Sequence, residues 1–401
     1  SDGTIAGSVY GGGALASVGP PMTSQSKYEQ KAPSDDHASY SLNRVNIKGG
    51  TITGSVYGAS RGPGDSFREN AFHGGVSTTE TAPQYYNPTM FATSLWTEVN
   101  VTGGTIRNSV YGGGEMGQVK ESTVVNLTGG DIAHDAFGGG KGTDLIAADI
   151  GGNTTVELNK DVDDDERGCS LERVFGCNDL NGTPKGHPLV HVYATRHKTK
   201  DKIIPDGDKY AKFDKLSDYT ISNYSGLTTL ATAVGVDVSS YTTTLSGSGD
   251  NTTKETALAN MIEAIAEQKY DVLTVYGGGN MAKYDPTDAY STDPLIKKSA
   301  RTEVIIEGCD ETSIKQVYGG GNAAPVPATT LTINSAYEIH EAFGGGNGKD
   351  NYSVKEGTPA TDVWYENPGA NVGYDNYTHY HEDTDDPAGT NYGSGSLANP
   401  Y

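Results

Sequence analysis

A short unit, an aromatic residue followed by glycine, recurs along this chain and constrains its fold more than any other feature. The segment "SVYGGGEMGQV" begins at Ser109, and a close variant, "QVYGGGNAAPV", begins at Gln316. The closest successive copies lie 25 or 26 residues apart. Recurrence at this period predicts a fold assembled from equal stacked units. The aromatic residues of the eight copies are Tyr10, Tyr57, Tyr111, Phe137, Phe175, Tyr276, Tyr318 and Phe343.

Most units follow a stretch in which apolar and polar residues alternate, such as "TEVNV" (97–101), "TVVNL" (123–127) and "TEVII" (302–306). Alternation of period two predicts a strand with one buried face. A turn, a second short strand that ends at the aromatic residue, the glycine turn and a third short stretch follow. This order, within about 25 residues, predicts one coil of a parallel β-solenoid.

The residues of the unit then have structural roles. We expect the valine or alanine to fill the core and the aromatic ring to stack on its equivalent in the next coil. We expect the glycines to turn corners with positive φ angles, which glycine adopts freely. The alternative is a phosphate-binding loop, which requires Lys-Ser/Thr after the glycines and a helix behind them. The continuations "EMGQ", "KGTD" and "NAAP" favour corner glycines.

We therefore predict an all-β fold, a right-handed parallel β-helix (β-solenoid) with long loop insertions and a small α-containing insert. The coils are expected over residues 1–197, interrupted by loop insertions at 19–40 and 59–94, and again over 270–349. Residues 350–401 are rich in Tyr, Asn and Asp and are predicted to form a terminal coil, a cap or a tail.

Residues 198–269 are predicted to form an inserted mixed α subdomain. Within it, "TKETALANMIEAIAEQKY" has the period of an amphipathic helix, and Thr252 with Glu255 is the expected capping box. The segments "YAKFDKL" and "LTTLATAVGV" are candidates for shorter helices. The apolar face of the long helix is predicted to contain Leu258, Met261, Ile262 and Ile265.

Charge and composition restrict the partners. The formal net charge of −22 argues against nucleic acid and anionic membranes. No apolar run is long enough to span a bilayer. The chain opens in the middle of a repeat, so we expect it to be excised from, or part of, a longer chain. Cys169, Cys177 and Cys309 are too few for a disulfide scaffold and lack zinc-site spacing.

Calcium is a candidate ion, because "DVDDDER" (161–167) concentrates carboxylates and calcium takes 6–8 oxygen ligands. The spacing is not that of an EF-hand, and a solvated acidic loop is the competing interpretation. The candidate calcium ligands are Asp161, Asp163, Asp165 and Glu166. His379 and His381 of "THYHED" could form a transition-metal pair, with a polar tail as the competing interpretation. No other cofactor is predicted.

Other candidate sites are weaker. Asp131 with Asp135, or Glu338 with Glu341, could be nominated as the carboxylate pair of a glycosidase. His191 alternates with valines and is expected to face solvent. Cys177 is expected to be a small corner residue and not a nucleophile. Tyrosines of the insertions could contact sugars or proteins, or pack the loops: Tyr85, Tyr86, Tyr284, Tyr290, Tyr374, Tyr377 and Tyr380.

The units "GGTI…SVYGGG" and "VYGGGNAA" resemble repeats in very large, Gly-rich surface proteins of gut and oral Bacteroidota. The resemblance implies a right-handed β-helix at the cell surface and supplies no catalytic residues. Two units depart from it. Cys177 replaces a glycine in "FGCND", and "VYGAS" after Val56 loses the triple glycine.

We expect an extracellular, non-enzymatic structural or adhesive protein, a rigid rod that presents loops to a glycan or a protein at the cell surface. The first coil lacks the alternating strand that precedes the other units. Removed upstream chain is the favoured explanation, and the alternative is head-to-tail self-association into fibres, with residues 350–401 of a neighbour covering this coil. The alternative is a carbohydrate-active enzyme, a polysaccharide lyase or glycoside hydrolase. A groove that holds two carboxylates, or a Lys/Arg–acid pair at catalytic distance, would discriminate the two.

Overall fold

The computed structural model describes residues 3–18, 42–62, 92–162, 168–195, 216–268, 270–286, 300–309 and 311–348, and the backbone of 352–356 and 361–365. Strands in parallel sheets dominate this part of the chain, and helices are few. The prediction of a strand-rich, parallel fold is confirmed at this level. Most of the predicted loop insertions 19–40 and 59–94, and all of 366–401, lie outside the described residues.

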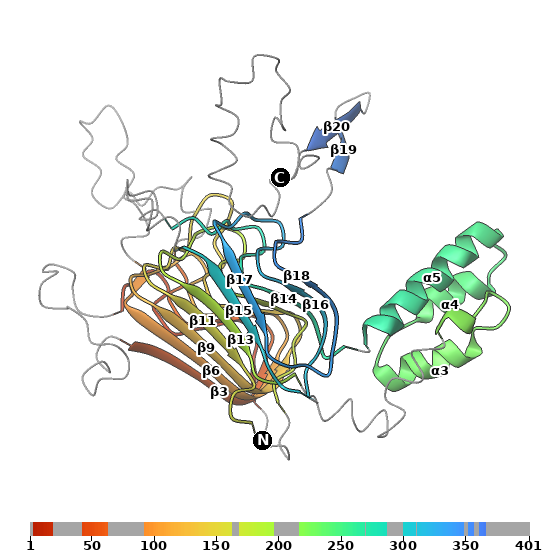
Figure 1. The fold of residues 1–401 in the computed structure, drawn as a ribbon, viewed down its shortest axis with the longest axis horizontal. Coiled ribbons are helices and arrows are strands. Elements are labelled where there is room, and N and C mark those ends of the chain that lie inside the picture. The colour runs from red at the N-terminus through yellow and green to blue at the C-terminus, as the bar shows by residue number, and fades with distance from the viewer. Residues whose placement is uncertain are drawn as a thin grey trace, which may run out of the picture.

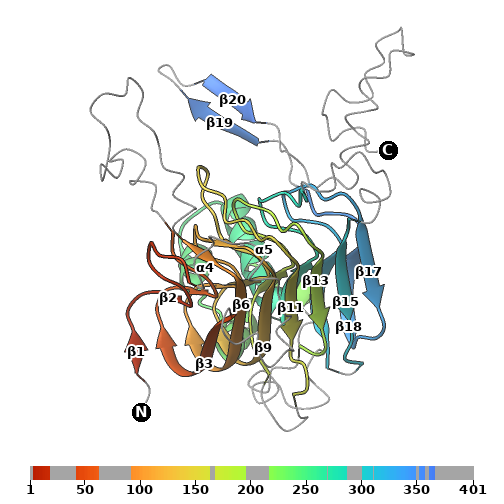
Figure 2. The ribbon, with the colours of Figure 1, turned by 90° about the vertical axis from the view of Figure 1, so that its left-hand side faces the viewer.

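The first of two large sheets, here sheet A, has eight strands, and all neighbouring pairs are parallel. Five of its strands contain the predicted alternating stretches, whereas β1 and β3 were not predicted from them, and Figure 2 shows the strands side by side with the helical insert behind them. In spatial order they are β1 (Thr4–Ile5), β3 (Leu42–Ile52), β6 (Trp96–Ile106), β9 (Thr123–Ile132), β11 (Thr154–Leu158), β13 (Pro188–Val192), β15 (Thr302–Ile306) and β17 (Thr329–Ile333).

Sheet B contains the aromatic residues of the repeat and is also parallel throughout. Every one of its strands ends at the aromatic residue. In chain order they are β2 (Val9–Tyr10), β4 (Val56–Tyr57), β7 (Val110–Tyr111), β10 (Asp135–Phe137), β12 (Arg173–Phe175), β14 (Val272–Tyr276), β16 (Ser313–Tyr318) and β18 (Glu338–Phe343).

A third, shorter run of parallel pairing continues the units after the glycines. β5 (Thr93–Ser94) pairs with β8 (Gln118–Val119), and single bridges extend the run from Val119 to Ile150 and from Ile150 to Pro184. Four successive units therefore contribute backbone to this third run as well as to the two large sheets.

Equivalent residues of successive units pair with one another across both sheets. In sheet B, Val110 pairs with Ala136, Ala136 with Val174, and Val174 with Val275. These four side chains are fully buried in one core between the two sheets. Alternation along sheet A sends every second residue into that core and the remaining residues to the outer face.

A threonine at the start of each of five sheet A strands ties that strand to the glycine turn of its own unit. Its hydroxyl donates to a glycine carbonyl, at 2.5–2.7 Å between oxygens, and the bond is buried in every case except the last, Thr329–Gly344. The bond satisfies a backbone acceptor at the turn. The pairs are Thr97–Gly112, Thr123–Gly138, Thr154–Gly176, Thr302–Gly319 and Thr329–Gly344.

The expectation that the repeat glycines adopt positive φ angles was wrong. Gly112 and its equivalents do not have positive φ angles, whereas Gly104 and Gly130 of the "TGG" turns do. Gly112 is required by close approach instead, because a Cβ there would lie 2.3 Å from the carbonyl oxygen of Gly138 in the next unit. The glycines let the backbones of stacked units touch.

A helical insert lies to one side of the sheets, between β13 and β14 in the chain (Figure 1). It contains a 3₁₀ turn (Leu216–Asp218), α3 (Ser225–Val234), α4 (Ser239–Ser246) and α5 (Asn251–Glu267) around a separate apolar core. The ion pair between Glu267 Oε1 and Lys315 Nζ, at 2.8 Å, connects it to sheet B.

The structure corrects one sequence expectation about the insert, adds a helix and leaves one expectation untested. The Thr252–Glu255 capping box is wrong, because Asp250 is the N-cap and its side chain accepts from the backbone N–H of Thr253 at 2.8 Å. Helix α4 was not predicted. Most of "YAKFDKL" lies outside the described residues.

Residues 352–365 contribute an antiparallel hairpin, β19 (Tyr352–Glu356) with β20 (Thr361–Tyr365), instead of another parallel pair. Among the described residues, no helix is long and apolar enough to cross a membrane.

Candidate functional site

The eight aromatic residues of the repeat form one continuous column along sheet B. Successive ring centroids are 4.6–5.1 Å apart, and successive ring planes differ by 4–11°. This spacing matches the distance between neighbouring strands, so each ring stacks on its equivalent. The column is a structural element that connects all eight units.

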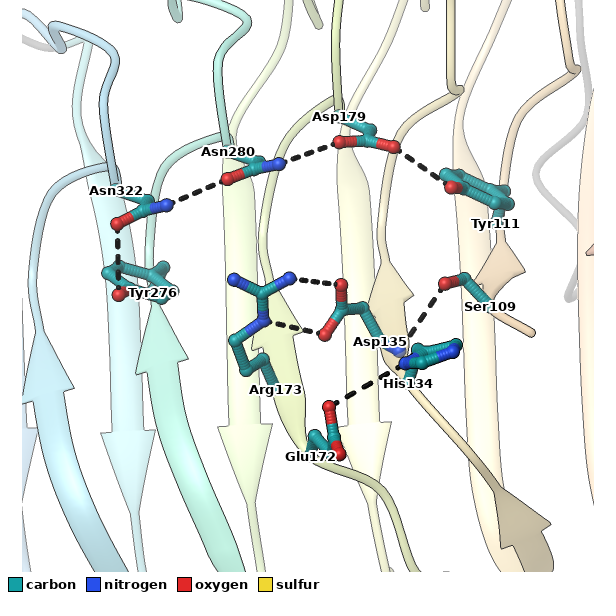
Figure 3. Close-up of polar contacts among 10 residues, drawn as sticks. All are labelled: Ser109, Tyr111, His134, Asp135, Glu172, Arg173, Asp179, Tyr276, Asn280 and Asn322. Atoms are coloured by element: carbon teal, nitrogen blue, oxygen red, sulfur yellow. Dashed lines mark hydrogen bonds and ion pairs between the residues drawn. The ribbon is translucent and has the colours of Figure 1, made fainter. Parts of the chain in front are cut away.

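A row of polar residues runs beside the aromatic column, four positions after the ring in six units. Asn280 Nδ2 donates to Asp179 Oδ1 at 2.9 Å, and Asn322 Nδ2 donates to Asn280 Oδ1 at 2.8 Å. Asn347 continues the row with a 2.8 Å bond to Asn322. Figure 3 shows how the row crosses from one unit to the next. At the other end, Lys141 and Glu115 form an ion pair at 3.3 Å.

Tyrosines of the column bond to this row through their hydroxyl groups. Tyr111 donates to Asp179 Oδ2 at 2.9 Å, and Tyr276 donates to Asn322 Oδ1 at 3.1 Å (Figure 3). Desolvation raises the pKa of Asp179, although the hydrogen bonds from Asn280 and Tyr111 act in the opposite direction. Desolvation also raises the pKa of Tyr276, to about 12. Hydrogen bonds between these side chains therefore hold the row and the tyrosine hydroxyls in place.

A second polar cluster lies at the starts of β10 and β12. The guanidinium of Arg173 binds the carboxylate of Asp135 twice, at 2.8 Å and 2.6 Å, and lies over the ring of Phe175. Beside it, His134 and Glu172 are 3.7 Å apart (Figure 3). A bidentate pair of this kind occupies both carboxylate oxygens. Asp135 therefore serves as a link between units and not as the general acid of a glycosidase.

The outer face of sheet A has a hollow of about 420 Å³ across β6, β9 and β11. Its lining includes Trp96 and the short side chains of Ser122, Val124 and Thr155. The other lining residues are Leu42, Thr97, Glu98, Thr123, Asn126, Asn153 and Glu157.

The polar groups of the hollow are fixed by neighbours. Glu98 forms an ion pair with Arg44 at 2.9 Å and accepts from Asn100 at 2.7 Å. Desolvation raises the pKa of Glu98, but these hydrogen bonds outweigh it and the net direction is downward, so the group is a carboxylate at neutral pH. Glu157 Oε1 contacts Lys160 at 2.8 Å and Tyr193 at 3.3 Å.

The predicted calcium ligands are not brought together in the described structure. Asp161 is described and has a positive φ of 54°, but Asp163, Asp165 and Glu166 lie outside the described residues. Among the residues that are described, no group of three or more metal-ligating side chains exists. The calcium site stays a prediction.

Several sequence interpretations change with the structure. His191 does not simply face solvent, because its side chain is only 16% exposed, lies 3.4 Å from Glu307 and stacks on Tyr193. Tyr284 is buried and donates to the carbonyl of Gly186, so it is no exposed contact residue. Cys177 is fully buried, and desolvation raises the pKa of its thiol. The six other tyrosines nominated for contacts lie outside the described residues.

Sequence reasoning missed two features. The row beside the aromatic column was visible as the polar residue after the glycines, for example in "VYGGGN". The hollow was not visible, since it depends on neighbours across three strands.

No protein-family model, curated protein or solved structure matches this chain.

Proposed function

We propose that this chain is a right-handed parallel β-helix that acts as an extracellular structural or adhesive protein. The observation that carries the proposal is the unbroken column of eight stacked rings, from Tyr10 to Phe343. A column of stacked rings has a structural role, because it holds the stacked units in register along one axis. A rod built this way presents its insertions at a fixed spacing.

The charged clusters support a structural function. Arg173 with Asp135, Lys141 with Glu115, and Arg44 with Glu98 each connect residues of different units. Their separations in the chain are 38, 26 and 54 residues. Groups that satisfy one another across units stabilise the stack, whereas catalytic groups must be available to a substrate.

The alternative, a carbohydrate-active enzyme, has one supporting observation, the two carboxylates Glu98 and Glu157 at one hollow. Both groups have basic partners, Arg44 for Glu98 at 2.9 Å and Lys160 for Glu157 at 2.8 Å. Because these partners occupy oxygens of both carboxylates, we favour a structural role over hydrolysis.

The ends of the stack support head-to-tail association as a second part of the proposal. β1 and β17 are the edge strands of sheet A, and β2 and β18 those of sheet B. Ile5 at one end and Ile333 and Phe343 at the other are 41–49% exposed. Parallel edges with exposed apolar residues favour pairing with further backbone. Light scattering should detect polymers that grow with concentration, and a constant monomer mass would argue against fibres.

Location is tested by antibodies against this chain, applied to intact and to permeabilised cells of its source. The proposal predicts equal labelling of both. Labelling that requires permeabilisation would contradict it.

A further inference from the structure

We propose that strand β20 of one copy of this chain docks in parallel on the open edge of β3 in a second copy. The inference rests on the head-to-tail association proposed above, and it names the strand and the surface that form the contact. Three observations carry it: an edge of β3 that the first unit leaves open, the sequence pattern of β20, and the side chains that a parallel register brings together.

The first unit covers only part of β3. On that side β1 pairs with β3 at Thr51 and Ile52, whereas β6 pairs with β3 along nearly its whole length on the other side. Figure 2 shows the short β1 beside the longer β3. Within the described ranges, residues 43–47 of β3, here the open segment, therefore have a strand on one side only. Such an edge is a template for a further strand.

The core beside the open segment is less covered than the core of the next unit. Val45 of the open segment is 7% exposed, whereas its register partner Val99 is fully buried. In the facing sheet Val9 is half-buried, whereas its partner Val56 is fully buried. In the following units a sheet A strand with alternating apolar residues covers these positions. A strand of the same pattern beside the open segment would cover Val45 and Val9 in the same way.

β20 has the sequence of a sheet A strand but belongs to neither large sheet. Its sequence "TDVWY" begins with threonine and has apolar residues at the third and fifth positions, like "TEVII" of β15 and "TTLTI" of β17. It begins 32 residues after Thr329, and the strand at Thr154 begins 31 residues after that at Thr123. The structure places β20 in a two-stranded antiparallel hairpin with β19. A hairpin leaves one edge of β20 open, and a lone hairpin is marginally stable in water.

The register of the stack would bring complementary side chains of β20 and β3 together. In the other units the first residue of each pattern pairs with the first residue of the next, so Thr361 would lie opposite Asn43. This alignment places Asp362 opposite Arg44, whose side chain is 51% exposed. Opposite charges directly across two strands stabilise their pairing. The residue after Asp362 in the pattern is a valine, and it would lie opposite Val45.

A second copy must supply the strand, because the hairpin cannot reach its own β3. The backbone N–H of Gly348 donates to the carbonyl of Asn322, so Gly348 lies at the level of the last units. Tyr352 follows it by four residues, about 14 Å when extended, and Tyr365 pairs with Tyr352 about 5 Å away. The level of β1 is seven strand spacings from β17, about 34 Å. The intact hairpin therefore fits the open segment of a neighbour.

Light scattering of the full chain tests which strand makes the contact. Val363→Asp should raise the Kd of association at least tenfold, about 1.4 kcal/mol, because it places a carboxylate against the apolar core beside Val45. Ser353→Asp is the matched control. It adds the same charge to the same hairpin, but Ser353 pairs with Trp364, and alternation puts this pair on the opposite face from Val363. It should change the Kd less than twofold.

Disulfide cross-linking between two proteins tests the register. Arg44→Cys and Asp362→Cys are made in separate chains, each with Cys309→Ser to remove the exposed thiol. After mixing and mild oxidation, we expect a dimer that contains one copy of each chain, because directly opposed residues lie within disulfide range. Trp364→Cys replaces Asp362→Cys in the matched control. Its offset of two residues puts the Cα atoms about 8 Å apart, so this mixture should stay monomeric on a non-reducing gel.

Three outcomes would overturn the inference: equal Kd values for the Val363→Asp and parent proteins, equal cross-linking of both mixtures, or dimers from Asp362→Cys chains alone, which would show that hairpins pair with each other. Circular dichroism of each variant checks that the strands persist. Polymers that tolerate Val363→Asp would leave head-to-tail association standing through another contact. A parent chain that stays monomeric would contradict the association and the inference together, whereas cell-surface labelling tests the extracellular function separately.

Discussion

The ring of Phe137 lies against the ring of Phe175, with 4.6 Å between centroids and 7° between planes. On its other face Phe137 stacks on Tyr111 at 4.9 Å, and its side chain is buried. Neither phenylalanine can form the hydroxyl bonds of the neighbouring tyrosines. Stacking therefore holds their side chains in the column without side-chain hydrogen bonds, and the guanidinium of Arg173 lies over the ring of Phe175.

Replacing Phe137 with alanine should therefore destabilise the protein strongly. We expect the free energy of unfolding to fall by about 3–5 kcal/mol, as for other buried aromatic residues. Phe343→Ala is the matched control, because Phe343 ends the column and is 41% exposed. It should cost about 1 kcal/mol or less. Urea unfolding measures both values, and equal losses would show that the column does not stabilise the stack.

Gly112→Ala tests the close approach of stacked units. The added methyl group would lie 2.3 Å from the carbonyl oxygen of Gly138, which is backbone and cannot move aside alone. We expect a loss of about 3 kcal/mol. At the equivalent Gly344 no atom lies within 4 Å of a Cβ, so Gly344→Ala should be neutral within about 0.5 kcal/mol. A neutral Gly112→Ala in thermal or urea unfolding would contradict the packing described.

The repeat pattern of the sequence predicted much of the fold for a physical reason. Alternation and a period near 25 residues place equivalent residues opposite each other, and the structure pairs Val110 with Ala136 and Val56 with Val110. The role of Gly112 was misjudged, because contact between backbones of different units leaves no local signal in the chain. The N-cap was misplaced because Asp250 and Thr252 are both acceptable caps by composition.

The candidate site was less predictable. The hollow is lined by Trp96 of β6, Val124 of β9 and Thr155 of β11, so its lining comes from three strands. Such properties depend on register, which is a feature of the assembled sheet.

Asp179→Asn should change the pH dependence of stability. Desolvation raises the pKa of Asp179 in the folded protein. At a pH between the unfolded and the folded pKa, folding takes up a proton. The free energy of unfolding therefore falls as the pH rises through this range. The amide matches its neighbours Asn280 and Asn322, and Tyr111 can accept from it after its hydroxyl rotates. We expect the variant to be more stable than the parent at neutral pH, with the difference vanishing near the unfolded pKa of about 3.9.

Glu98→Gln is the control, because we expect it to change the pH dependence of stability in the opposite direction. The net effect of its environment lowers the pKa of Glu98, so its ion pair with Arg44 contributes stability above the unfolded pKa and loses it as pH falls through the folded pKa. The variant should be less stable at neutral pH by about 1 kcal/mol or less, as for exposed pairs. Urea unfolding across pH compares the two, and parallel pH profiles for Asp179→Asn and the parent would contradict the raised pKa.

The in-register stack itself is tested most directly by paired cysteines. Leu189 and Glu303 are register partners although the helical insert separates them in the chain. Their Cα atoms are about 4.8 Å apart, within the 4.4–6.8 Å that a disulfide spans, whereas Leu189 and Ile305 are offset to about 8 Å. Both double variants are made in a Cys309→Ser background, which removes the exposed thiol. After mild oxidation of the folded protein, the variant with Leu189→Cys and Glu303→Cys should form a disulfide. The variant with Leu189→Cys and Ile305→Cys should keep both thiols reduced, and a count of free thiols distinguishes the two. Equal oxidation of both pairs, or oxidation of the offset pair alone, would contradict the account.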